Sequence, residues 1–142
     1  MKEKINTLYS NDNNLAYKTL LELEISCSES AELYNYFDEL LCMLKNEKSF
    51  IRVRGFRLIC SLAAWDKDNK INNNISFILD ELNDNAGTSL RQCIKYLNLI
   101  LLYKPELNDN IVKALKRIDL KKYKPSMQKL IINDINLLLN NI

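Results

Sequence analysis

The stretch LLCMLKNEKSFIRVRGFRLICSL, residues 40–62, contains the pattern that decides the fold. Its first part continues a series of apolar residues at three- and four-residue steps, which is the stripe of an amphipathic helix. That series is Leu33, Phe37, Leu40, Leu41 and Leu44. The polar run KNEKS predicts a turn, and a second apolar helix is expected over residues 50–65. The stretch therefore predicts a helical hairpin.

The hairpin pattern recurs along the chain. Ala16, Val53, Leu90 and Met127 lie 37 residues apart, and each opens a similar helical run. A period of this length is typical of stacked helical hairpins. The step predicts a single domain of four hairpins, at about residues 1–30, 31–69, 70–107 and 108–142.

The composition favours an all-α protein. The chain has 142 residues, of which 47% are hydrophobic and 27% charged, so one folded core is expected. Two glycines and two prolines are too few for a many-turned β protein. The net charge of +2 offers no bulk attraction for nucleic acid or an anionic membrane. The N-terminus has no signal-like apolar run, and no segment is long enough to span a bilayer, so we expect a cytoplasmic protein.

The residue types argue against an enzyme. The chain has no histidine, its four cysteines lie far apart, and no glycine-rich phosphate loop is present. We therefore expect no catalytic residue, no cofactor and no metal. Cys42 and Cys60 lie in apolar helical contexts and are expected to be buried, reduced thiols. The carboxylates of three acidic pairs are expected at exposed positions: Asp38 and Glu39, Asp66 and Asp68, Asp80 and Glu81.

Residues 40–62 resemble a HEAT repeat, and the whole chain is similar to the HEAT/armadillo type of helical repeat protein. The resemblance rests on an apolar first helix, a short polar turn, and a second helix that opens with an aliphatic residue followed by arginine. Val53 and Arg54 show this pair, and Leu90 and Arg91 repeat it. The resemblance implies a right-handed α-α superhelix, or solenoid, whose second helices line a concave groove.

Positions that vary between the repeats are the candidates for a binding groove. Seven of them combine cations, aromatic rings and exposed leucines, which suits a protein or peptide partner. These residues are Tyr17, Arg54, Leu58, Trp65, Arg91, Lys95 and Leu102. Two structural alternatives stay open. Arg54 and Arg91 can instead tie neighbouring repeats to a turn residue such as Glu47, Asp84 or Asn85, and Trp65 can be packed in the core.

Nucleic-acid binding is the second hypothesis. It would use a local phosphate-binding patch of Arg52, Arg54, Arg57, Arg91 and Lys95, although a solvated helix face explains the same charges. A second basic cluster lies near Pro125, where lysines can also satisfy helix C-terminal carbonyls. Its members are Lys116, Arg117, Lys121, Lys122 and Lys124.

The last helix carries apolar residues around most of its circumference, more than one buried stripe requires. We expect Ile132, Ile135, Leu139 and Ile142 to form a face that is covered by a homodimer partner or by a larger protein. The alternative is that this helix is buried within the single chain. A purely structural subunit of a complex is a third possible role.

Overall fold

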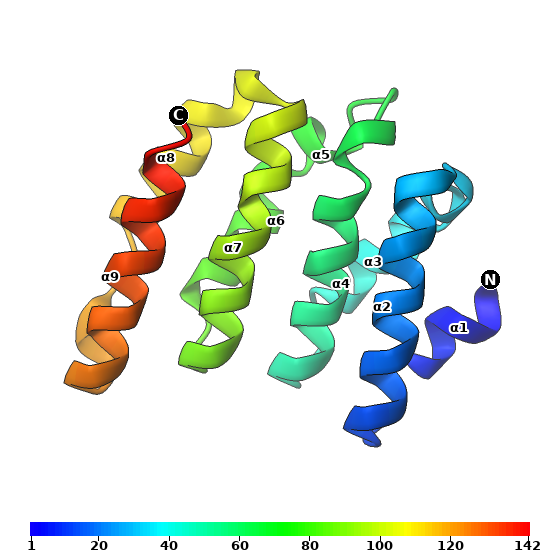
Figure 1. Ribbon diagram of the computed structural model, residues 1–142, viewed down its shortest axis with the longest axis horizontal. Helices are drawn as coiled ribbons and strands as arrows, with labels where there is room; N and C mark the ends of the chain where they lie inside the picture. The colour runs from blue at the N-terminus through cyan, green and yellow to red at the C-terminus, as the bar shows by residue number, and fades with distance from the viewer.

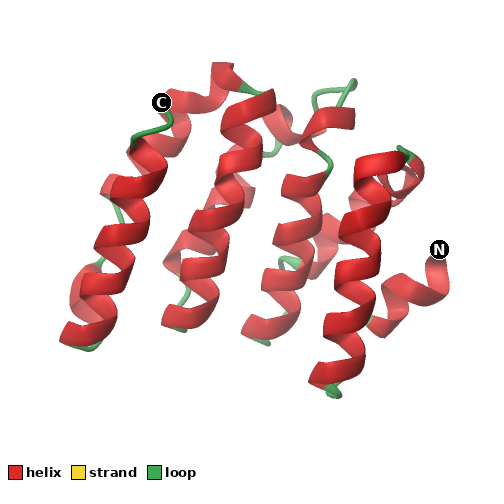
Figure 2. Ribbon diagram, viewed as in Figure 1, coloured by secondary structure: helices red, strands yellow, loops and turns green.

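The computed structural model describes residues 1–142, and the chain is all-α, as predicted. Figure 2 shows helices and loops throughout and no strand. The α-helices are α1 (Lys2–Thr7), α2 (Asn13–Glu29), α3 (Phe37–Met43), α4 (Ser49–Ser61), α5 (Lys70–Asn73), α6 (Ile75–Leu79), α7 (Gly87–Tyr103), α8 (Asn108–Lys116) and α9 (Pro125–Leu139). Short 3-10 helices are η1 (Glu32–Tyr36), η2 (Ala63–Trp65), η3 (Asp80–Asn83), η4 (Pro105–Leu107) and η5 (Leu120–Lys122).

The helices form two layers. The long helices α2, α4, α7 and α9 stand side by side in chain order, and the shorter helices lie behind them (Figure 1). Helix α4 contacts α2, α3 and α7, and α7 contacts α4 and α9, so each long helix is packed against its neighbours in the row. We call the side of this row that faces away from the shorter helices the front face.

The turns within the hairpins share one local device. Ser10, Asn46, Asp84 and Asp119 each accept a hydrogen bond from the backbone N–H two residues further on. Such side-chain-to-backbone bonds favour a turn over a continued helix. The asparagines and aspartates of the sequence thus define where one helix of a hairpin ends and the next begins.

The 37-residue step is visible in contacts between neighbouring turns. Lys48 Nζ donates to Asn11 Oδ1, and Lys122 Nζ reaches Asn85 Oδ1, and in each case the partners are 37 residues apart. At the other end of the hairpins, Lys104 Nζ donates to the carbonyl oxygen of Asp66, 38 residues away. Equivalent parts of successive hairpins therefore lie against each other.

A single hydrophobic core runs from Ile5 in α1 to Leu138 in α9. Ala16, Val53 and Leu90 of the repeated register are buried in their helices. Helix α4 is the most enclosed element, because it has α3 behind it and a long helix on each side. Burial of a large aliphatic side chain contributes about 1.5–3 kcal/mol, so this shared core stabilises all the hairpins together.

Several local expectations are wrong. Cys42 is exposed, because α3 packs through Phe37, Leu40 and Met43 and leaves position 42 on its outer side. Asp66 and Glu81 are buried, whereas exposed positions were predicted. The helix expected over residues 50–65 ends at Ser61 and continues as the 3-10 helix η2.

Asp66 is buried because it organises the loop between η2 and α5. Its carboxylate accepts hydrogen bonds from the hydroxyl of Tyr34 and from the backbone N–H groups of Lys70 and Ile71, and it lies 3.1 Å from Lys104 Nζ. Burial by itself raises the pKa of a carboxyl, but these donors outweigh burial and hold the pKa of Asp66 below its usual value. This aspartate stabilises the fold.

The two glycines make a matched test of helix packing. A Cβ at Gly55 would lie 2.8 Å from Met43 Cβ and 3.1 Å from the Leu40 carbonyl oxygen, so Gly55→Ala should force α3 and α4 apart. We expect the free energy of unfolding in urea to fall by about 1–2 kcal/mol. A Cβ at Gly87 meets only the flexible Met127 side chain, so Gly87→Ala should change stability by less than about 1 kcal/mol. Equal losses of unfolding free energy in the Gly55→Ala and Gly87→Ala variants would contradict the close packing of α3 on α4.

Candidate functional site

Two depressions open on the front face. The larger lies between α7 and α9 and has a volume of about 560 Å³; we call it the α7–α9 groove. It is lined by Thr88, Arg91, Gln92, Ile94, Lys95, Asn98, Asp134, Leu137, Leu138 and Asn141. The smaller one, of about 340 Å³, lies between α2 and α4. It is lined by Asn13, Asn14, Tyr17, Leu20, Phe50, Val53, Arg54, Arg57 and Gln92. Gln92 borders both, so the depressions adjoin near the middle of the row.

Arg57 lies between the two depressions and is buried. Its guanidinium donates to both carboxylate oxygens of Glu24, at 2.7 and 3.1 Å, and to Gln92 Oε1 at 3.0 Å. The Tyr96 ring covers it at 4.5 Å from the ring centroid, and the Tyr17 ring lies at 5.9 Å. This cation therefore joins α2, α4 and α7, and its charge is neutralised within the chain.

Arg54 ties the second hairpin to the first, as the structural alternative predicted. It is buried and donates to the carbonyl oxygens of Leu8 and Ser10 and to Asn13 Oδ1. Burial lowers the pKa of this arginine, which nonetheless stays cationic at any ordinary pH. The partners are backbone carbonyls and an amide of the first turn, not the turn residues named from the sequence.

Arg91 forms one wall of the α7–α9 groove. Its Nε lies 2.6 Å from Asp134 Oδ2, and its Nη2 donates to the other carboxylate oxygen of the same aspartate. The bidentate pair links α7 to α9 and leaves Arg91 partly exposed. Arg91 is therefore both a junction residue and a groove residue.

Arg52 is the fourth arginine with partners inside the chain. It lies 2.9 Å from Asp84 and 3.2 Å from Glu81, and it also donates to the backbone carbonyls of Asn46 and Glu47. Of the five cations in the expected phosphate-binding patch, Lys95 alone has no carboxylate or hydrogen-bond partner. Each of the four arginines of that patch is thus engaged with its own partners inside the chain.

The remaining groove candidates divide between the surface and the core. Tyr17 and Lys95 are exposed on the front face, and Leu102 is 65% exposed further along α7. Trp65 is half-buried and donates its indole N–H to the carbonyl oxygen of Cys27, which ties it to α2. Leu58 is fully buried and lies outside the groove.

Leu58 is buried because it lies on the side of α4 that faces α3. Gly55 faces α3, and Leu58, three residues later, points to the same side of the helix. Arg57 takes the front position that Lys95 occupies on α7, and these two residues are 38 apart, not 37. A one-residue shift turns a helix position by about 100°.

The sequence pattern missed most of the groove residues that the structure brings together with Arg91 and Lys95, among them Gln92, Asp134, Leu137 and Asn141. Gln92 could not be recognised from the repeat pattern, because the equivalent position of the preceding hairpin, 37 residues earlier, is Gly55. Asp134, Leu137 and Asn141 lie on the α7-facing side of α9. No repeat spacing pointed to Asp134, because it lies 43 residues after Arg91 and not one 37-residue step.

The predicted C-terminal face is only partly exposed. Ile132 and Ile142 are 43% and 50% exposed, whereas Ile135 and Leu139 are half-buried and pack against the core. These positions lie away from the α7–α9 groove, because other residues of α9 line that groove. The outward side of α9 also carries Lys129, Asn133, Asn136 and Asn140, so its apolar surface is narrower than expected.

The other chemistry of the chain is modest. All four cysteines are free, and burial raises the pKa of the Cys27 thiol to about 12. No group of three or more Cys, Asp or Glu side chains is placed to hold a metal ion. None of the helices combines the length and the apolar character that crossing a bilayer requires.

Comparison of the chain with protein families, with curated proteins and with solved structures finds no match.

Arg57 and Glu24 offer a stability test. We expect Arg57→Met to lower the free energy of unfolding by about 3 kcal/mol, because the Glu24 side chain, only 13% exposed, is then left without its partner. Adding Glu24→Gln should restore part of that loss. Urea unfolding of the single and double variants measures both effects, and Arg91→Met is the control, with a smaller loss because its pair is more exposed.

The buried carboxyl of Glu81 should make the stability of the fold depend on pH. Burial raises the pKa of its carboxyl to about 7 despite the nearby Arg52. Since this folded-state value exceeds the unfolded one, its contribution to stability is full below about pH 4.5 and is lost as the pH rises through 7. The loss should be on the order of 2 kcal/mol between pH 5 and pH 8. Glu81→Gln should abolish it, and Asp80→Asn, at the exposed neighbour, should not.

Proposed function

We propose that this chain is a non-enzymatic interaction adaptor of the HEAT-like superhelical type, which binds a peptide or helix of another protein on its front face. The main support is the α7–α9 groove, where apolar side chains, amides and an unpaired cation line one depression. The 37-residue contacts between turns support the repeat architecture. The free cysteines fit a reducing compartment such as the cytoplasm.

The apolar part of the groove would receive leucine-like side chains. Leu137 is 60% exposed at its edge, and Ile94 and Leu138 lie at its base. Side chains of this kind gain free energy when a partner removes them from water. The groove volume is within the range of about 300–1,000 Å³ that ligand sites commonly have.

The charged part would receive a carboxylate. Lys95 is exposed in the groove and has no ion pair, whereas Arg91 is already held by Asp134. The unpaired charge of the groove is thus cationic, which favours a partner segment that carries aspartate or glutamate next to apolar residues.

Nucleic acid fits the same face less well. A phosphate backbone is bound by several accessible cations along its path. Here Arg52, Arg54 and Arg57 are engaged with carboxylates and carbonyls inside the chain. Lys95 by itself offers a point contact, which suits one carboxylate of a peptide.

Panning a displayed library of random peptides against the protein tests this function. We expect the selected peptides to combine acidic and large apolar residues and to lose about tenfold in affinity on Lys95→Glu, which is about 1.4 kcal/mol. Leu137→Asp should also weaken binding. Lys67→Glu, the same charge change at an exposed loop position outside the groove, is the control and should leave the affinity unchanged.

Three outcomes would contradict the proposal. Selected peptides that lack acidic residues would remove the role of Lys95. Equal losses in Lys95→Glu and Lys67→Glu would point to a bulk charge effect. Retention of mixed DNA or RNA at low ionic strength, with no peptide selected, would favour the nucleic-acid hypothesis instead.

A further inference from the structure

The two ends of the helical stack carry opposite charge. Residues 1–47, which include α1, α2 and α3, contain four lysines and nine carboxylates, a net charge of −5. Residues 113–142, which include the last turn of α8 and all of α9, contain seven cations and two carboxylates, a net charge of +5. The overall charge of +2 conceals this separation. We call these parts the acidic end and the basic end.

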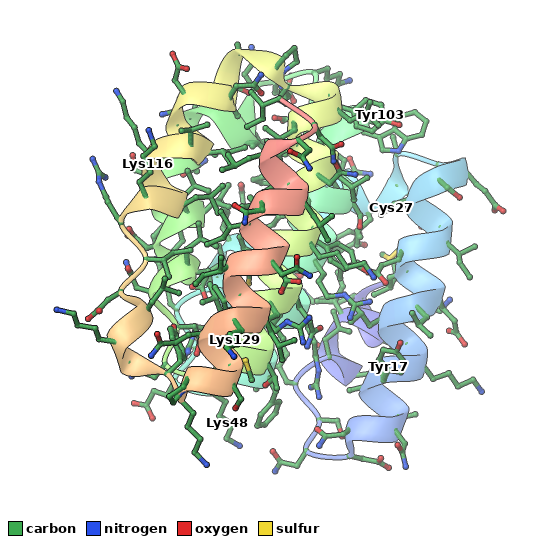
Figure 3. All side chains as sticks on the ribbon, turned by 60° about the vertical axis from the view of Figure 1, so that its left-hand side comes forward. Tyr17, Cys27, Lys48, Tyr103, Lys116 and Lys129 are labelled. Carbon is green, nitrogen blue, oxygen red and sulfur yellow. The ribbon has the colours of Figure 1, made fainter.

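Six of the seven cations of the basic end are free of internal partners. Those exposed without an ion pair or side-chain hydrogen bond are Lys113, Lys116, Arg117, Lys121, Lys124 and Lys129. Lys122 reaches Asn83 and Asn85, and is the one member of the predicted cluster that satisfies a carbonyl. Figure 3 looks toward this end and shows Lys116 and Lys129 on opposite sides of the last hairpin. The exposed Ile132 belongs to the same end.

The acidic end has the complementary features. Glu22, Glu29 and Glu32 are exposed, and only Glu22 has an ion-pair partner, Lys4 at 3.7 Å. Ile25, on the same helix, is 61% exposed. The acidic end thus combines carboxylates with an uncovered apolar side chain.

The junctions inside the chain use the same combination. Arg57 of α4 pairs with Glu24 of α2, and Arg91 of α7 pairs with Asp134 of α9, in each case beside apolar contacts between the long helices. The pair of Arg91 with Asp134 has the cation on the preceding hairpin and the carboxylate on the following one, which is the polarity that a contact between the basic end and the acidic end would have. The pair of Arg57 with Glu24 has the reverse polarity.

Like ends would repel. A symmetric dimer through α9 would place two surfaces of net charge +5 against each other, and like charges in an interface disfavour it. We propose that copies of this chain associate head to tail, with the basic end of one copy against the acidic end of the next. Such a contact joins different surfaces, so it extends into a chain or closes into a ring.

Two triple variants test the two ends separately. Each variant replaces three exposed charged residues of one end. The acidic-end variant is Glu22→Gln, Glu29→Gln and Glu32→Gln, and the basic-end variant is Lys116→Gln, Lys121→Gln and Lys124→Gln. Each reduces the charge of its end from 5 to 2 units. Thermal unfolding verifies that both variants are folded.

The measurement is sedimentation analysis at about 0.02 M and at about 0.5 M salt. Attraction between charged ends extends over roughly tens of ångströms at the lower salt concentration and over only a few ångströms at the higher one. We expect the mass of the unaltered protein to rise above 16.6 kDa with concentration at low salt and to return to it at high salt. Each variant should stay monomeric by itself. An equimolar mixture should form a dimer and nothing larger, since only one complementary pair of ends remains. Lys95→Glu, in the groove, should leave assembly intact.

Three results would overturn the proposal. The unaltered protein could stay monomeric at low salt up to millimolar concentration. The acidic-end variant could still dimerise by itself, which would indicate a symmetric contact through the basic end. The basic end could bind duplex nucleic acid or anionic vesicles while the protein stays monomeric, which would assign it to an anionic partner of another class.

Discussion

Each hairpin of this chain leaves one side of its long helix uncovered until the next hairpin packs against it. Helix α4 shows the completed arrangement, since α2, α3 and α7 surround it and none of its residues is exposed. Helix α9 is the last long helix of the row, and Ile132 and Ile142 are exposed. This constraint makes the core continuous, and it leaves two kinds of surface for interaction: the front face and the two ends.

Ion pairs follow the same junctions. Arg57 with Glu24 and Arg91 with Asp134 each connect long helices of neighbouring hairpins, and Lys104 with Asp66 connects the loop ends. A buried cation without its partner is costly, so these pairs constrain how the hairpins align. The arginines therefore have a structural role in the stacking of the hairpins, whereas Lys95 has no carboxylate partner within the chain.

The sequence predicted the features that depend on the local spacing of apolar residues. The all-α class, the hairpin over residues 40–62 and the long final helix follow from apolar spacing and turn residues. It could not predict the rotation of each helix, because a shift of one residue moves a side chain by about 100°. Leu58 is buried and Cys42 is exposed for this reason. Likewise Asp134 could not be paired with Arg91, since the two residues are brought together only by the packing of α7 on α9.

Net charge is a poor guide to the electrostatics of a stacked protein. In a compact fold, opposite charges far apart in sequence end up mixed over one surface. In a row of hairpins, sequence order is spatial order, so −5 near the start and +5 near the end stay separated along the molecule (Figure 1). Screening acts over about 10 Å at 0.1 M salt, which is shorter than the distance between the ends of the row, so each end acts on a partner as an independent charge. A near-neutral repeat protein can therefore present two strongly charged surfaces.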